Sequence, residues 1–210
     1  MILTSTKDKD RRLKVLLDLK LTAVTFGRHW QYSNSKSPYP NLLWVDVAGN
    51  LGIEQCVTGF YEKGARNIGF IGWPISNQIT PKNVNDDRYL GWKQATNQLN
   101  LPQKNLAFFG NESIETGQVG LQKLLRINPD LDAVVCVSDS IAFGAILTAK
   151  SLNLNNLLIS GFDNSPISKE FNFTSVDQNL DQVAGQALNL LLKKEIKSSL
   201  IEPKVIFRYS

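Results

Sequence analysis

The stretches that decide the fold are Val137–Gly144 (VSDSIAFG) and Ile159–Asn164 (ISGFDN). In each stretch an apolar run typical of a β-strand ends abruptly at an aspartate, and the first stretch continues directly into a helix pattern of small residues. An acid at the carboxyl end of a buried parallel strand faces the crevice in which open α/β sheets bind ligands. Asp139 and Asp163 are 24 residues apart, which predicts two neighbouring strands that serve one crevice. Two aspartates in that position suit a ligand rich in hydroxyl groups.

Strand-like and helix-like segments alternate along nearly the whole chain. We expect strands at 21–26, 41–47, 67–72, 106–109, 133–138, 157–162 and 205–208. We expect helices around residues 13–17 and at 49–63, 88–99, 116–127, 139–151 and 182–194. This alternation predicts βαβ units and parallel sheets, so the fold class is α/β. Several strands are continuously apolar, which predicts that helices cover both faces of a sheet.

The composition is that of an ordinary globular protein, with 210 residues, 42% apolar, 20% charged and a net charge of +4. Basic residues are scattered, and no dense basic tract indicates a nucleic-acid surface. No apolar run approaches the ~20 residues that a membrane helix needs, and Met1–Asp8 lacks the features of a signal peptide. Cys56 and Cys136 are isolated in apolar surroundings, which indicates buried free thiols in a reducing compartment. We therefore expect a cytoplasmic protein with no membrane partner.

The motifs of common catalytic sites are missing from the sequence. His29 is the only histidine, and no nucleophile-elbow G-x-S-x-G accompanies it. Neither a G-x-x-x-x-G-K-[ST] phosphate loop nor a G-x-G-x-x-G fingerprint is present. Asp139 and Asp163 form a conceivable acid–base pair, but ligand recognition or helix capping is the simpler role. We therefore expect no enzyme activity, no cofactor and no metal site.

Eight short motifs follow one another in the order of a known family. They are TFGR (25–28), WVDVAG (44–49), GARNIGFIG (64–72), RYLGW (88–92), SDSIAFG (138–144), GFDNSP (161–166), FTSVDQ (173–178) and RYS (208–210). Through them the chain resembles the effector-binding core of the lac repressor / galactose repressor family of bacterial transcription factors. Each motif alone is weak, whereas the ordered set spans essentially the whole chain.

The resemblance implies a two-lobe fold like that of periplasmic binding proteins, with a parallel sheet flanked by helices in each lobe and three crossovers between them. The N-terminal lobe would hold residues 1–44 plus 176–203, and the C-terminal lobe residues 45–175 plus 204–210. Family members begin with a helix-turn-helix that reads the major groove. Nothing here corresponds to that domain, so we expect a chain truncated at its N-terminus, with an incomplete first lobe.

The resemblance also implies an effector in the cleft between the lobes. The expected ligand contacts are Asp163, Arg88, Ser138, Asp139, Trp44, Gln178, Phe26 and Arg28. Arg88 offers a planar fork of donors that can hold two vicinal hydroxyls. The alternatives are a solvated turn for Asp163, a surface ion pair for Arg88 and core packing for Trp44. A further alternative is that Ser138 or Asp139 caps the following helix.

The function that the resemblance implies is effector binding and dimerisation within a sugar-responsive repressor, with lobe closure controlling DNA binding. The expected partners are a small-molecule effector, a second copy in a homodimer, and operator DNA through the missing headpiece only. A sugar is favoured over a phosphosugar or a purine, because no dense phosphate-binding cluster accompanies the acids and amides. The alternatives are a periplasmic sugar-binding transport protein of the same fold and an enzyme on a doubly wound scaffold.

Overall fold

The computed structural model describes residues 1–4, 10–28, 42–73, 84–194 and 197–208. Contacts within the chain group these residues into two units. Unit 1 lies within Met1–Ala48, Gln78–Val84 and Asn179–Glu202, and unit 2 within Gly49–Asn77, Asn85–Gln178 and Pro203–Ser210. Among the described residues the chain passes between the units after Ala48, Val84, Gln178 and Glu202. The lobe boundaries that the resemblance implies stay a prediction.

Unit 1 is a small parallel sheet with two helices. Its elements are β1 (Ile2–Leu3), α1 (Arg11–Asp18), β2 (Val24–Phe26), β3 (Leu43–Val47), α7 (Leu180–Leu191) and β9 (Ser199–Ile201). The strands pair in the order β1-β2-β3-β9, and every pair is parallel. The periodic leucines of α1 form a small cluster with the first strand, in which Leu3, Leu13 and Leu16 are buried.

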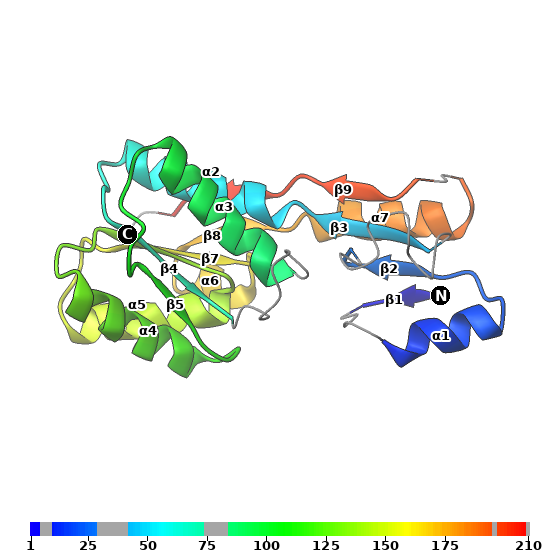
Figure 1. Cartoon of the computed structure of the whole chain (residues 1–210), viewed down its shortest axis with the longest axis horizontal. Coiled ribbons are helices and arrows are strands. Elements are labelled where there is room, and N and C mark those ends of the chain that lie inside the picture. Colours follow the sequence, from blue (N-terminus) through cyan, green and yellow to red (C-terminus); the bar gives the residue numbers. More distant parts are fainter. Residues whose placement is uncertain (5–9, 29–41, 74–83, 195–196, 209–210) are drawn as a thin grey trace. The chain divides into compact units, whose positions relative to one another are not determined.

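Unit 2 is larger and contains both stretches that predicted the fold. Its helices are α2 (Gly49–Glu62), α3 (Val84–Gln98), α4 (Ile114–Ile127), α5 (Asp139–Ser151) and α6 (Pro166–Glu170). Its strands are β4 (Ile68–Gly72), β5 (Ala107–Phe109), β6 (Ala133–Cys136), β7 (Leu158–Phe162), β8 (Thr174–Asp177) and β10 (Lys204–Ile206). Figure 1 shows α2 and α3 on one face of the sheet and α4 and α5 on the other.

The sheet of unit 2 has the order β10-β8-β7-β6-β4-β5. All pairs are parallel except β10 with β8, so one antiparallel edge strand completes an otherwise parallel sheet. Strands β4 and β6 are buried at every position, which explains their uninterrupted apolar sequences. The predicted α/β fold with helix-covered parallel sheets is confirmed.

Two details of the predicted elements were wrong. The helix expected at 88–99 begins four residues earlier, at Val84, so Arg88 lies in its second turn rather than at its start. Strands β8 and β9 and the short helix α6 were not among the expected elements. Among the described residues no helix is long and apolar enough to span a membrane.

Candidate functional site

The parallel strands β4, β6, β7 and β8 of unit 2 have their carboxyl ends at the same edge of the sheet. The chain runs from β4 outward to β5 and then returns to β6 on the other side of β4, so the connections diverge between β4 and β6. In open α/β sheets the crevice outside the carboxyl ends of the strands at such a switch point is the usual place for a ligand. Trp73 follows β4, Ser138 follows β6, Asp163 follows β7 and Gln178 follows β8.

Arg88 is held at this edge by neighbours at the carboxyl ends of three strands, β4, β6 and β7. Its side chain is buried, with 5% of the residue exposed. Its Nη1 donates a hydrogen bond to the carbonyl oxygen of Val137, and its guanidinium carbon lies 3.6 Å from the ring centroid of Phe162. The same carbon lies 5.7 Å from the ring centroid of Trp73. The surface ion pair that was the alternative for Arg88 does not fit this burial, because the guanidinium is stacked and fixed inside unit 2.

Asp163 is a partly buried carboxylate beside Arg88. Its backbone φ is +125°, a positive value that residues other than glycine seldom adopt. Its Oδ1 accepts a hydrogen bond of 2.6 Å from Gln178 Nε2. Burial raises the pKa of Asp163 to about 6, although the charge of Arg88 and the hydrogen bond from Gln178 act in the opposite direction. A carboxylate with so high a pKa at a sheet edge is a candidate functional group.

Asp139 uses its carboxylate within unit 2. Its Oδ2 accepts hydrogen bonds of 2.7 Å from both the backbone N–H and the hydroxyl of Ser165. Its Oδ1 accepts a hydrogen bond of 2.5 Å from the hydroxyl of Ser175. A Cβ at Gly161 would lie 2.2 Å from this oxygen, so only glycine permits the approach. These bonds tie the turn after β7 to β8 and give Asp139 a bracing role.

Ser138 is the N-cap of α5. Its hydroxyl accepts a hydrogen bond of 3.4 Å from the backbone N–H of Ile141, and only 3% of the residue is exposed. Of the two residues for which capping was an alternative, Ser138 therefore is the cap. Asp139 occupies the first turn, where its negative charge complements the positive end of the helix dipole. A direct ligand contact by either residue stays a prediction.

The remaining predicted contacts lie on unit 1. Phe26 ends β2, Trp44 lies in β3, and Arg28 follows the turn after β2. Arg28 Nε donates a hydrogen bond of 2.8 Å to Asp46 Oδ2, and its guanidinium carbon lies 5.8 Å from the ring centroid of Trp44. The side chains of Arg28 and Asp46 are 15% and 7% exposed. Of the two roles expected for Arg28, bracing is the one that these contacts support, and a ligand contact stays a prediction.

Asp46 holds three donors of unit 1, so its removal should destabilise that unit. Its Oδ2 also accepts a hydrogen bond of 3.2 Å from the backbone N–H of Arg28, and its Oδ1 one of 2.8 Å from Val47. We expect Asp46→Ala to lower the free energy of unfolding by about 2 kcal/mol, since it removes the acceptor of three hydrogen bonds and the carboxylate that pairs with the largely buried Arg28. Urea unfolding measures this. Asp130→Ala, at an exposed position, is the control and should change stability by less than about 0.5 kcal/mol.

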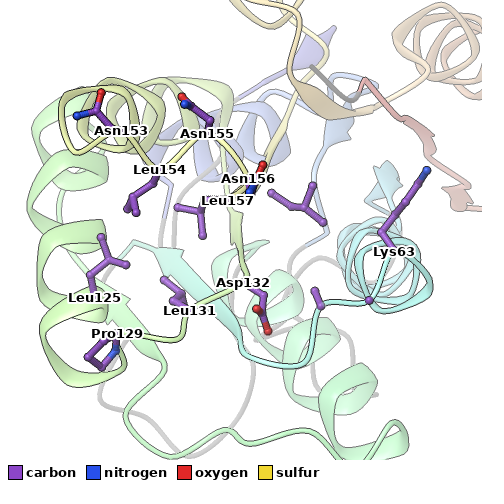
Figure 2. A pocket seen from close by; sticks show the side chains of 13 residues that line it. Lys63, Leu125, Pro129, Leu131, Asp132, Asn153, Leu154, Asn155, Asn156 and Leu157 are labelled. Carbon is purple, nitrogen blue, oxygen red and sulfur yellow. The ribbon is translucent and has the colours of Figure 1, made fainter.

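A hollow of about 410 Å³ lies at the opposite, amino edge of the unit 2 sheet. Figure 2 shows it between the end of α4, the loop before β6 and the loop before β7, with Asp132 and several leucines around it. Its lining includes Lys63, Leu131 and Leu157, but none of the predicted site residues. Oδ2 of Asp132 already accepts backbone N–H bonds of 2.8 Å from Arg66 and Asn67. The hollow is therefore a second possible ligand location, and an experiment can distinguish ligand binding there from ligand binding at the carboxyl edge.

Three residues at the carboxyl edge were missed in the sequence analysis. Trp73 and Phe162 face the Arg88 guanidinium, and the carbonyl of Val137 accepts its hydrogen bond. Phe162 immediately precedes Asp163 at the end of a predicted strand, and this position could have identified it as a site residue from the sequence. Backbone carbonyls carry no signal in a sequence. His29, the only histidine of the sequence, lies outside the described residues.

Known proteins share this fold and are similar in sequence to part of this chain. Residues 57–210 match the family described as periplasmic binding protein-like domain. The chain belongs to this family. Its relatives and structural neighbours are LacI-family transcriptional regulators, so the resemblance predicted from the eight motifs is confirmed. These relatives are regulators rather than enzymes.

Individual members of the family match over different lengths. The regulator RegA of Clostridium saccharobutylicum is 29% identical over 154 residues, which cover 70% of this chain and 45% of RegA. The repressor PurR of Actinobacillus pleuropneumoniae is 31% identical over 152 residues, which cover 69% of this chain and 44% of PurR. A LacI-family regulatory protein from Chloroflexus aggregans superposes with a TM-score of 0.85 at 29% identity, covering 100% of this chain and 75% of that one. The alignments thus span less than half the length of the two sequence relatives.

Proposed function

We propose that unit 2 of this periplasmic binding protein-like chain binds a small-molecule effector at the carboxyl edge of its sheet. The observation that carries the proposal is the juxtaposition of Arg88 and Asp163 at the carboxyl edge of the sheet, where β7 adjoins the strands of the switch point. A guanidinium that is stacked on Phe162 and a carboxylate bound to Gln178 are fixed in place before any ligand arrives. Fixed donors and acceptors of this kind bind with little loss of side-chain entropy.

The proposed effector is a neutral sugar. The forked donors of Arg88 and the acceptor oxygens of Asp163 complement neighbouring hydroxyl groups, which both donate and accept. In the described part of this edge, acids and amides outnumber the arginines, which are Arg88 and Arg208, the latter bonded to Asn164, so a free sugar fits better than a phosphosugar. Contacts from Phe26, Arg28 and Trp44 of unit 1 complete the predicted set.

The proposed role in the longer protein is that of its relatives. Effector binding would drive lobe closure and thereby change the affinity of a separate DNA-binding domain for operator DNA, because a ligand shifts an equilibrium by its different affinity for the two states. A homodimer, a cytoplasmic location and the lack of enzymatic activity belong to the same proposal. The transport-protein alternative is not favoured, since the relatives are transcriptional regulators.

A thermal-shift screen tests the proposal. The chain is melted in the presence of free sugars, sugar phosphates, purines and amino acids. A ligand at ~100 times its dissociation constant should stabilise the chain by about 2.7 kcal/mol. We expect a selective shift from a neutral sugar. If only purines raised the melting temperature, the proposed effector site would stand, but its ligand would be a purine instead of a sugar. A cooperative melt whose temperature no compound raised would contradict the proposal.

Arg88→Lys should weaken effector binding although it keeps the positive charge. Lysine lacks the planar fork and cannot stack on Phe162 in the same way, so one of two hydroxyl contacts is lost. We expect the affinity measured by calorimetry to fall about 10-fold or more, as for one lost hydrogen bond to a charged group. Arg126→Lys, at an exposed position of α4, is the matched control. Equal affinities of Arg88→Lys and wild type would exclude a bidentate role.

A further inference from the structure

The chain leaves unit 2 through a tightly held segment. Gln178 is the last residue of unit 2, and Asn179 begins unit 1 as the N-cap of α7 with a φ of +54°. Just before this crossing, Ser175 Oγ accepts a hydrogen bond of 2.9 Å from the backbone N–H of Asn164. Asp177 Oδ2 accepts one of 2.8 Å from Asn164 Nδ2. The turn after β7 therefore fixes the residues that lead into the crossing.

The residue at the crossing is bonded to the proposed effector contact. Gln178 Nε2 donates its 2.6 Å hydrogen bond to Oδ1 of Asp163, from the neighbouring strand end. A short bond from an amide to a carboxylate is charge-assisted and stronger than a neutral one. Ligand hydroxyls that donate to Asp163 would compete for the same oxygen charge. Occupancy of Asp163 would therefore change the bond that holds Gln178.

A second crossing touches the other proposed contact. The chain enters unit 2 at Gly49, and a Cβ there would lie 3.0 Å from Cγ of Arg88. The backbone N–H of Asn50 donates a hydrogen bond of 3.2 Å to Asp87, the neighbour of Arg88 in α3. Both proposed effector contacts thus adjoin residues at which the chain changes units. Only the Gln178 contact is a side-chain hydrogen bond that a ligand could compete for directly.

We infer that Gln178 is a positioning residue that couples occupancy of Asp163 to the crossing at Asn179. This inference rests on the proposed function, in which Asp163 contacts the effector. It changes the predicted role of Gln178 from a ligand contact to a positioning residue that links Asp163 to the crossing. The charged groups around Asp163 are Arg88 from α3 and Asp139 from α5, and both Asp177 of β8 and Arg208, which follows β10, are bonded to the adjacent Asn164. The backbone N–H of Asp139 also donates a hydrogen bond to the Asp163 carboxylate, but Asp139 lies in α5, whereas Gln178 directly precedes the crossing.

An NMR titration without any ligand tests the coupling. The carboxyl carbon of Asp163 and the backbone amides of Asn179 and Leu180 are followed in wild type between pH 4.5 and 8. We expect the two amides to shift with the same midpoint as Asp163, near pH 6. In Gln178→Met, which removes the donor but keeps the length, Asp163 should titrate at a higher pH. The amide shifts at the crossing should then shrink at least fivefold.

Two further variants complete the test. Gln178→Asn keeps an amide but is one methylene too short, so it should resemble Gln178→Met. Gln103→Met removes another glutamine donor, which bonds the Lys93 carbonyl at 2.8 Å, and should leave the crossing amides unchanged. The inference would be overturned if the amide shifts of Asn179 and Leu180 did not follow the titration of Asp163 in wild type. It would also be overturned if these amide shifts were as large in Gln178→Met as in wild type. A failed ligand screen would reject the proposed function, whereas this titration judges the coupling separately.

Discussion

Asp163→Asn is expected to stabilise the unliganded chain at neutral pH and to weaken effector binding at the same time. The pKa of Asp163 is raised to about 6 by burial, so the native state holds this proton more tightly than the unfolded chain. Between pH 4 and 6 the native state binds more protons, and stability therefore falls as the pH rises. Two pKa units correspond to about 2–3 kcal/mol. Asparagine carries no such cost at pH 7, and it has the same branched Cγ as aspartate, so the backbone cost of the φ of +125° should be similar in both proteins.

The measurement is urea unfolding of wild type and Asp163→Asn at several pH values. The stability of the variant relative to wild type should rise by about 2 kcal/mol between pH 4 and pH 7, after allowance for partial exposure. Effector affinity should fall about 10- to 100-fold, because asparagine offers one uncharged acceptor in place of a carboxylate. If the stability of the two proteins changed with pH in the same way, Asp163 would be a solvated turn residue with an unshifted pKa. That is the alternative given for Asp163 in the sequence analysis.

Gly144→Ala is expected to be the most destabilising of these substitutions. Helices α4 and α5 approach each other through two glycines. A Cβ at Gly144 would lie 1.9 Å from the carbonyl oxygen of Ile114, and one at Gly117 would lie 1.9 Å from that of Ile141. Both obstacles are backbone atoms, so the helices must separate to admit a methyl group. We expect a loss of about 3 kcal/mol or more in the free energy of unfolding.

Gly185→Ala is the matched control for this substitution. Gly185 lies in the middle of α7, and a Cβ there would meet nothing within 4 Å. Alanine should stabilise the chain by about 0.5–1 kcal/mol, since glycine is a poor helix former. Urea unfolding at pH 7 compares the two variants. Wild-type stability in Gly144→Ala would show that α4 and α5 do not pack through their glycines.

The sequence predicts the fold best where burial is uniform. Helix α5 begins at Asp139 and ends at Ser151 as expected, because a buried strand, a serine cap and a small-residue pattern adjoin one another. Helix α3 was placed four residues late because its first turn, Val84–Asp87, carries no apolar periodicity. Strand β8 was missed because its four residues, TSVD, are largely polar although Thr174, Ser175 and Val176 are buried.

The candidate site could be predicted in part. Strand-end position alone selected Asp163, and the structure adds its bond to Gln178 and its raised pKa. For Asp139 the same signal could not show the bonds from Ser165 and Ser175, which lie 26 and 36 residues further along the chain. Such long-range polar contacts follow from tertiary packing, so strand-end position does not distinguish a bracing aspartate from one that binds a ligand.

The most direct test of the proposed effector site is amide chemical-shift mapping with a compound that stabilises the chain. Perturbations should centre on Trp73, Arg88, Val137 and Asp163, with a smaller response at Asn179. The same compound should bind Asp163→Asn and Arg88→Lys more weakly. Perturbations centred on the hollow at the amino edge, around Lys63, Asp132 and Leu157, would contradict the account and place the ligand at the opposite end of the sheet.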